Sequence, residues 1–197
     1  MDNEFTIVNS VVVGCLGILG LVIKRMLNSK TADPIMTQNG IDDNITTALE
    51  YLRQETSADR VVVHEFHNGG TYFSGNSQQK LSISYESLSK GTSSIFRKFQ
   101  NVRASALTSI VKRVMSDNIF MVDLDTETEP FLHDLRLHGS SKVKFALLRT
   151  LTNRTVGIIS IHHVKCSKVS LTDKEAGLID KQCKIITGYL VSHRIKI

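Results

Sequence analysis

Tryptophan is absent from this chain of 197 residues, and proline and cysteine are scarce, with two and three residues respectively. Three cysteines cannot build a disulfide framework, although Cys166 and Cys183 could pair in an oxidising compartment. The net charge of +5 is scattered, and basic residues do not interleave with aromatic ones, so we expect no nucleic-acid partner. The composition, 41% hydrophobic and 22% charged, is ordinary for a globular protein.

One long apolar run stands at the amino-terminal end. Residues 5–23 contain no charge, and at 1.5 Å per residue a helix of that length just spans a hydrocarbon core of about 30 Å. Asp2 and Glu4 precede the run, where a cleaved signal peptide would carry basic residues. The sequence therefore predicts a single-span anchor in the inner membrane over residues 1–27, a linker over 28–40 and a domain over 41–197.

The residues around this run predict its orientation. Lys24, Arg25 and Lys30 follow the run, so the positive-inside rule places the domain in the cytoplasm. Gly14 and Gly17 provide small surfaces that let membrane helices approach one another closely. We therefore expect the anchor to contribute to a homo-oligomer.

The residues from Lys142 to Val164 predict a buried β-hairpin. The runs 145–148 and 156–161 are apolar at consecutive positions, which is typical of strands covered on both faces at the centre of a sheet. Between them, Asn153 lies in a polar turn and tolerates the left-handed backbone that tight hairpins require.

The other elements follow from periodicity and turn signals. We expect helices over 41–56 and 107–115, a helical turn over 131–139, strands over 60–66 and 81–86, and a short extended run over 119–124. Asp42 and Asp43 would lie in the first turn of the first helix, and the turn signal at 67–70 would end the first strand. This order predicts an α+β domain with a central antiparallel sheet and helices packed on one face.

A final helix is predicted after Leu171. Thr172 and Glu175 have the spacing of a capping box, in which each side chain binds a backbone amide of the first turn. Five residues then recur at steps of three and four, as in a heptad seam that packs on the sheet and also contacts a second copy. They are Ala176, Ile179, Cys183, Ile186 and Leu190.

In their order and spacing, the segments 55–66, 120–125, 156–161 and 171–175 resemble those of a GAF domain, and the resemblance covers about residues 41–192. It implies a GAF-like or PAS-like antiparallel sheet whose loop-covered face often holds a small ligand, with first and last helices that make dimer contacts. The residue sets of cyclic-nucleotide-binding and bilin-attaching members are not seen, and we expect no cofactor. By strand position, a ligand would contact Phe66, Asn68, Tyr72, Tyr85 and His162, although a packed core without a ligand is equally compatible with the sequence.

Other candidate sites have a simpler explanation. Four histidines, His64, His67, His162 and His163, could bind zinc or sense pH, but strand alternation sends members of each pair to opposite faces. The carboxylates over 123–129 lack the pattern of a calcium loop and are expected to be solvated. No cysteine or serine has a recognisable partner base, so we expect no enzyme.

These observations favour a membrane-anchored, GAF-like domain that binds a small molecule or a protein partner as a dimer or higher oligomer. One alternative is a phage lysis protein, because holins of some large tailed phages are similar in layout, with one membrane helix before a globular domain. That domain would be periplasmic and would regulate lesion formation. A third alternative is a membrane scaffold protein.

Overall fold

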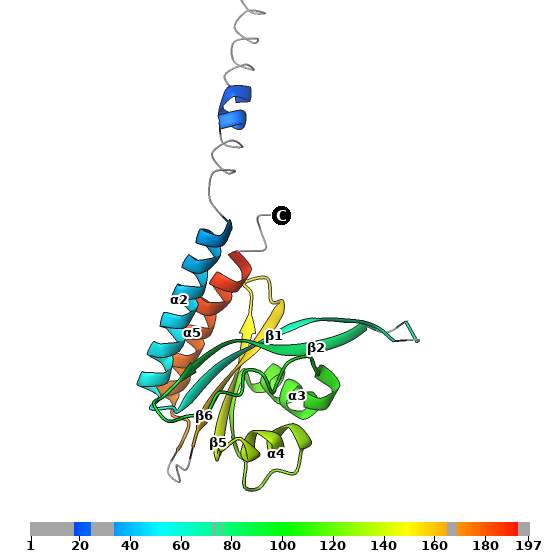
Figure 1. The fold of residues 1–197 in the computed structure, drawn as a ribbon, viewed down its shortest axis with the longest axis vertical. Coiled ribbons are helices and arrows are strands. Elements are labelled where there is room, and N and C mark those ends of the chain that lie inside the picture. Colours follow the sequence, from blue (N-terminus) through cyan, green and yellow to red (C-terminus); the bar gives the residue numbers. More distant parts are fainter. Residues whose placement is uncertain (1–17, 25–33, 73, 76, 165–168, 193–197) are drawn as a thin grey trace, which may run out of the picture. The chain divides into compact units, whose positions relative to one another are not determined.

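The structure of the chain is a computed structural model that describes residues 18–24, 34–72, 74–75, 77–164 and 169–192 (Figure 1). The chain divides into two compact units, residues 1–40 and 41–197. Residues 18–24 of the first unit are helical. Most of the predicted membrane span lies outside the described residues, and within them no helix has both the length and the apolar character needed to cross a bilayer.

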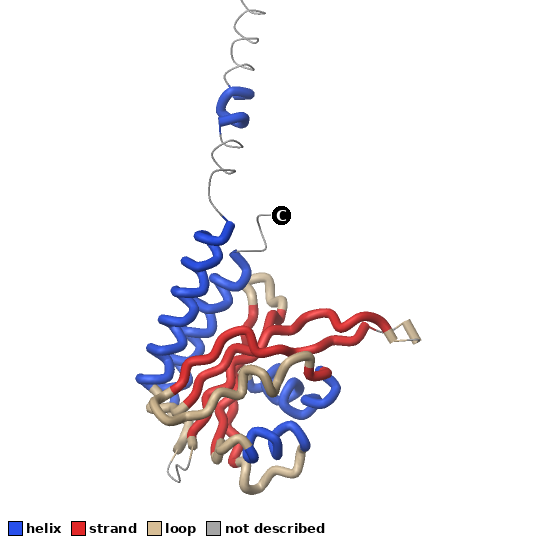
Figure 2. Tube along the Cα trace, in the orientation of Figure 1, coloured by secondary structure: helices blue, strands red, loops and turns tan. Residues whose placement is uncertain are grey.

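The second unit is built on one six-stranded antiparallel sheet in the order β3-β2-β1-β6-β5-β4 (Figure 2). The strands are β1 Arg60–Thr71, β2 Ser77–Leu88, β3 Val102–Arg103, β4 Ile119–Asp123, β5 Lys142–Arg149 and β6 Thr155–His163. The helices are α2 Pro34–Glu55, α3 Thr108–Asp117, α4 Pro130–Leu137 and α5 Asp173–Ser192, with a short 3-10 helix over Ala104–Leu107.

Helices cover both faces of the sheet, so the prediction of helices on one face was wrong. On one face, Val62, Phe145 and Ile158 pack against apolar residues of α3 and α4. On the other face, Val63 and Ile159 pack against α2 and α5. The central strands are apolar at consecutive positions, and an apolar face exposed to water would be unfavourable, so each face has to be covered.

The predicted hairpin is confirmed as β5 and β6. The two strands pair antiparallel with Ala146 opposite Ile159, and nearly all of their residues are buried. Asn153 in the connecting turn has a φ of 65°, the left-handed conformation that asparagine tolerates better than most residues.

The first two strands are longer than predicted. The signal at 67–70 does not end β1, which continues to Thr71 and pairs with β2 through a register shift between Asn68 and Thr71. β1 pairs with β6 from Arg60 to Glu65 and then continues with β2 as a two-stranded arm that leaves the sheet (Figure 2). A Cβ at Gly69 would lie 2.5 Å from the flexible side chain of Lys80, which would have to move to make room for it.

The first helix begins earlier than predicted. α2 starts at Pro34, so residues 34–40, which were predicted to be linker, are helical, and Asp42 and Asp43 lie beyond the first turn. Proline is well suited to the start of a helix because its fixed φ is helical and its missing N–H has no helical partner there. The predicted spacing holds further on, where Ile45 and Leu52 are buried against the sheet.

Candidate functional site

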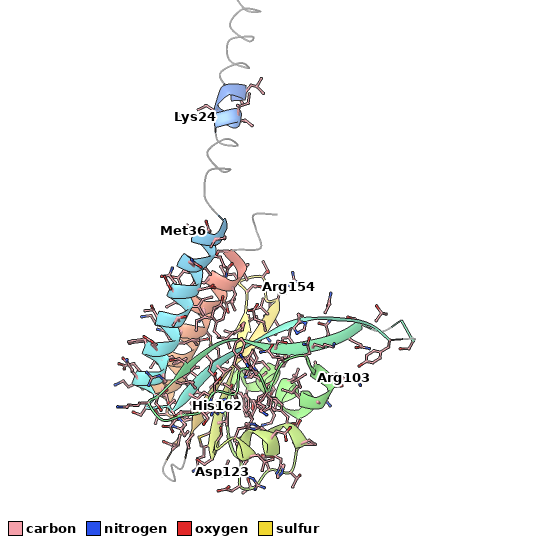
Figure 3. The ribbon with its side chains drawn as sticks, viewed as in Figure 1. Lys24, Met36, Arg103, Asp123, Arg154 and His162 are labelled. Atoms are coloured by element: carbon pink, nitrogen blue, oxygen red, sulfur yellow. The ribbon has the colours of Figure 1, made fainter. Side chains whose placement is uncertain are left out.

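A chain of five polar side chains runs under the face of the sheet that α3 and α4 cover. The guanidinium Nη1 of Arg60 donates to Ser140 Oγ at 3.2 Å, and Ser140 Oγ lies 2.9 Å from His162 Nδ1. His162 Nε2 lies 2.8 Å from Ser160 Oγ, which lies 2.7 Å from His64 Nε2. All five residues are buried, and Figure 3 shows His162 in the interior of the domain.

The register of β1 and β6 explains this arrangement. Arg60 pairs with His162, and Val62 pairs with Ser160, so these side chains share one face of the sheet. The Arg60 guanidinium Nη2 also donates to the carbonyls of Ser93 and His138, and its Nε lies 3.6 Å from the Glu86 carboxylate. Arg60 therefore ties the central strand to two loops that follow β2 and α4.

The donor and the acceptor of each hydrogen bond among these five side chains can be assigned. If the Ser140 hydroxyl donates to His162 Nδ1, then His162 Nε2 donates to Ser160 and the Ser160 hydroxyl donates to His64 Nε2. In the reverse direction, the Ser140 hydroxyl would accept from both Arg60 and His162, and its own proton would have no acceptor among these five side chains. The favoured direction leaves two N–H groups of these side chains without a hydrogen-bond partner among the described residues, at His64 Nδ1 and at Arg60 Nε, of which the second lies 3.6 Å from the Glu86 carboxylate.

Both ring systems are neutral at neutral pH. Burial lowers the pKa of His64 to about 3. Burial also lowers the pKa of His162 well below its usual value, and the positive charge of Arg60 lowers it further. Ser160 is fully buried, so a substrate cannot reach its hydroxyl in this conformation. We therefore assign this polar chain to holding the sheet and its loops together rather than to catalysis.

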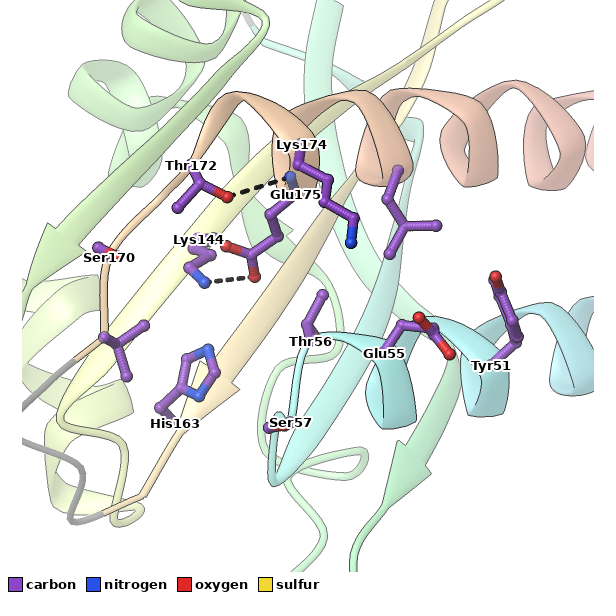
Figure 4. A pocket seen from close by; sticks show the side chains of 12 residues that line it. Tyr51, Glu55, Thr56, Ser57, Lys144, His163, Ser170, Thr172, Lys174 and Glu175 are labelled. Atoms are coloured by element: carbon purple, nitrogen blue, oxygen red, sulfur yellow. Dashed lines mark hydrogen bonds and ion pairs between the residues drawn. The ribbon is translucent and has the colours of Figure 1, made fainter.

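A cleft of about 580 Å³, which we call the Lys144 cleft, opens on the opposite face of the sheet (Figure 4). It lies between the end of α2 and the beginning of α5. Its lining comprises Tyr51, Glu55, Thr56, Ser57, Lys144, His163, Val169, Ser170, Thr172, Lys174, Glu175 and Leu178.

An ion pair forms one wall of the Lys144 cleft. Lys144 Nζ lies 2.5 Å from Glu175 Oε1, and the two side chains are 2% and 16% exposed. Thr172 Oγ1 accepts a hydrogen bond from the Glu175 backbone amide at 3.3 Å, as the capping box predicts. The other half of that prediction was wrong, because the Glu175 carboxylate binds Lys144 instead of returning to the backbone (Figure 4). A buried ammonium needs a carboxylate more strongly than a surface amide does.

His163 also lines the Lys144 cleft. Its side chain is buried, and Nε2 has no hydrogen-bond partner within the described part of the chain. Burial is the largest cause of its lowered pKa, and the Lys144 charge lowers that pKa further, against the opposing effects of Glu175, Asp59 and a hydrogen bond with the Ser57 backbone. The imidazole is therefore neutral at pH 7, and Nε2 can donate or accept a hydrogen bond from a bound molecule, depending on the tautomer.

The five residues predicted to meet a ligand do not share one surface. Phe66 packs at the edge of the core under α3 and α4, and His162 belongs to the buried polar chain. Tyr85 lies on the other face, where its hydroxyl donates to Asp42 Oδ1 at 2.6 Å. Asn68 and Tyr72 are exposed on the β1–β2 arm. Ligand binding by this set stays a prediction, and the structure does not bring its members into one cavity.

The predicted alternation of His162 and His163 is confirmed. His162 belongs to the polar chain, whereas His163 faces the Lys144 cleft on the other side of the sheet. In the described ranges, no group of three potential metal ligands is close enough to hold an ion. Sequence reasoning missed the pairing of Lys144 with Glu175, although a lysine directly before the apolar run 145–148 of a predicted buried strand was a usable signal for a buried ion pair.

The predicted seam of α5 faces the sheet. Ile179, Cys183 and Ile186 are buried in the core shared with α2, and Leu190 packs at its edge. Ala176 is half-buried. Burial raises the pKa of the Cys183 thiol to about 12. Gly14 and Gly17 lie outside the described residues, so the predicted oligomer contacts stay a prediction.

The fold is similar to that of GAF domains. A GAF domain/HD domain protein from Geobacter sulfurreducens aligns with a TM-score of 0.58 and 15% identity over 78% of this chain and 93% of that one. The blue-light-absorbing form of the PixJ GAF domain from Thermosynechococcus elongatus aligns with a TM-score of 0.60 and 15% identity, over 83% and 91% of the chains. The phycoerythrobilin-bound GAF domain of a cyanobacterial phytochrome aligns with a TM-score of 0.59 and 14% identity over 79% of this chain and 88% of that one.

At these identities the likeness shows the fold alone. No known protein-family model matches the chain, and no curated protein matches its sequence. The resemblance inferred from the sequence is thus confirmed at the level of a GAF-like α+β fold.

Proposed function

We propose that this chain is a membrane-tethered, non-enzymatic GAF-like domain that binds a small polar molecule in the Lys144 cleft. The main support for this proposal is the buried Nε2 of His163, which has no hydrogen-bond partner among the described residues and lies beside the Lys144–Glu175 ion pair in an open cleft. A buried polar atom without a partner is costly, so a ligand that pairs with it gains binding free energy. The GAF-like neighbours support a sensory or ligand-binding role, because one of them holds a bilin.

The charges of the cleft suggest the class of ligand. Lys144, Lys174 and the amino-terminal end of α5 contribute positive potential, whereas Glu55 and Glu175 contribute negative charge. A compact zwitterion, which carries both signs, complements such a lining better than a strong anion or cation does. By contrast, the face under α3 and α4 is filled by an apolar cluster that includes two aromatic rings, Phe99 and Phe131, 5.2 Å apart.

The test is a ligand screen by thermal unfolding of the full chain, using free amino acids and small betaines as probes. At one hundred times the dissociation constant a ligand stabilises by about 2.7 kcal/mol, which raises Tm by roughly 5–11 °C for a chain of this size. We expect His163→Gln to abolish the shift and His133→Gln, an exposed histidine on α4, to leave it intact. A shift that survives His163→Gln would move the ligand elsewhere, and no shift with any probe would refute zwitterion binding.

Tethering and orientation are separate parts of the proposal, supported by the apolar run at 5–23 and the basic residues after it. A cysteine placed at the exposed Asp125, in a chain with Cys166 changed to serine, reports the side of the membrane. We expect protection from an impermeant thiol reagent in intact cells and full labelling after lysis. Labelling in intact cells would place the domain outside.

Oligomerisation is proposed through the anchor glycines, because Ile179, Cys183 and Ile186 of the α5 seam are buried against the sheet of their own chain. Gly14→Leu together with Gly17→Leu should reduce cross-linked dimers of the full chain, because bulky side chains keep the membrane helices apart.

The holin-like alternative rests on the layout alone. It requires expression of the chain to permeabilise cells abruptly, and harmless expression would exclude it.

A further inference from the structure

A second cleft, which we call the hairpin cleft, lies between the β5–β6 turn and the last turns of α5. Its volume is about 590 Å³, within the range of small-molecule sites. Figure 3 shows Arg154 at this end of the hairpin. The lining comprises Arg149, Thr150, Leu151, Thr152, Arg154, Val156, Lys184, Thr187, Gly188, Val191 and Ser192.

All charged residues in this lining are basic. Arg149, Arg154 and Lys184 supply the charge, and no acidic residue lines the cleft. Lys184 is paired with Asp180 in an exposed ion pair. Arg149 Nη2 donates to the neutral sulfur of Met115 at 3.4 Å, and neither arginine has a carboxylate partner among the residues described. The cleft therefore carries positive charge that the described chain leaves uncompensated.

Two polar atoms of the lining are buried without a partner. Thr187 is 4% exposed, and its Oγ1 makes no hydrogen bond to any described residue. Arg149 Nε is likewise buried and makes no hydrogen bond to any described residue, so one edge of the guanidinium has an unused donor. A buried hydroxyl and a buried charged donor in this state each favour an external hydrogen-bond acceptor.

Part of the lining is apolar. Leu151 is fully exposed at the turn, and Val156 and Val191 lie toward α5, with the hydroxyls of Thr150, Thr152 and Ser192 among them. An apolar wall with a basic end matches a molecule that has an apolar tail and one anionic head. The chain's own last residues fit this role poorly, because Arg194 and Lys196 would bring like charge to the cleft.

We propose that the hairpin cleft binds an anionic amphiphile, with its carboxylate or phosphate head on Arg149 and Arg154 and its tail along Leu151 and Val191. Planar guanidinium groups bind such heads through paired hydrogen bonds. The Thr187 hydroxyl can donate to the same head. The amphiphile can come from the bilayer or from solution.

The experiment is photolabelling of the full chain in nanodiscs of phosphatidylcholine. The probe is a twelve-carbon fatty acid with a diazirine in its tail, and labelled carbons are mapped by mass spectrometry of peptic fragments. We expect label on the β5–β6 turn and on the end of α5. A parallel arm with a photoactivatable phosphatidylglycerol distinguishes a bilayer lipid from a free fatty acid as the source.

Charge-matched variants make the test specific. Arg149→Gln with Arg154→Gln should lower labelling of these fragments about tenfold, whereas Arg97→Gln with Arg103→Gln, two exposed arginines outside the cleft lining, should leave it unchanged. Circular dichroism checks that both variants are folded. Excess dodecanoate should compete, and dodecyltrimethylammonium should not.

Three outcomes would overturn the proposal. They are label spread evenly over the chain, equal competition by the cationic amphiphile, and labelling of the cleft only when each disc holds one copy. The last result would show that a second copy of the chain covers the cleft. None of these outcomes bears on ligand binding in the Lys144 cleft, which is tested by His163→Gln.

Discussion

Replacing Glu175 by Gln tests how much the Lys144 ion pair stabilises the fold. The change removes the carboxylate 2.5 Å from Lys144 Nζ and leaves the ammonium, only 2% exposed, without an opposite charge. Removing one partner of a buried pair costs about 3–5 kcal/mol. Because Glu175 is itself 16% exposed and water can reach its position, we expect a cost at or just below this range, about 2–3 kcal/mol of unfolding free energy.

The reverse substitution should cost much less. Lys144→Met keeps the aliphatic stem that packs on the sheet and removes the buried charge. The Glu175 carboxylate is then free to bind the Thr172 amide and complete the capping box. We expect a change within about 1 kcal/mol, and a double variant close to Lys144→Met, because the unpaired ammonium that destabilises Glu175→Gln is then absent.

Urea unfolding of the full chain, followed by circular dichroism, measures all three variants. Asp180→Asn is the matched control, because the Asp180–Lys184 pair has a similar distance of 2.6 Å but is largely exposed, and its loss should cost at most about 0.5 kcal/mol. Equal costs for Glu175→Gln and Lys144→Met would refute this reasoning. So would a Glu175→Gln variant as stable as the control.

Three further predictions concern the sheet and its core. Gly157→Ala should destabilise by about 1–3 kcal/mol or more in thermal unfolding, because the new Cβ would lie 2.2 Å from the carbonyl oxygen of His64; an unchanged Tm would contradict this packing. His64 is buried in its neutral form, whereas in the unfolded chain its imidazole binds a proton below its ordinary pKa of about 6.5. The unfolding free energy should therefore fall by about 1.4 kcal/mol per pH unit from pH 6.5 downward, toward the folded-state pKa of about 3. His64→Gln should reduce that slope in urea titrations at pH 7, 6 and 5, and an unchanged slope would argue against it. Cys183, buried and with its pKa raised to about 12, should react with a thiol reagent only on unfolding, and rapid labelling of the native chain at this residue would show that the core opens.

Local patterns were sufficient for much of the fold. The hairpin of β5 and β6 follows from consecutive apolar residues around a turn that contains Asn153, and these signals depend on neighbours a few residues apart. The faces of α2 and α5 follow from helical spacing, which buries Ile45 and Ile179. In each case the physical cause, the removal of apolar side chains from water, acts at positions that the sequence itself displays.

Local signals also misled where a long-range partner decided the outcome. The glycines at 69 and 70 indicate a turn, yet β1 continues because β2 pairs with it beyond them. Thr172 and Glu175 have capping-box spacing, yet the carboxylate binds a lysine from another element. Tertiary contacts are stronger than these preferences, which amount to about 1 kcal/mol each.

Local residue patterns predict most of the elements, their order and the apolar character of the central strands, but not β3 or the 3-10 helix over Ala104–Leu107. Which polar groups meet depends on how the elements pack. Arg60 reaches Ser140 across 80 positions of the chain, and Lys144 reaches Glu175 across 31. The hairpin cleft joins a turn to a distant helix end in the same way. Hydrogen bonds and ion pairs act over a few ångströms, so residues far apart in the sequence can form them only after packing has brought their elements together.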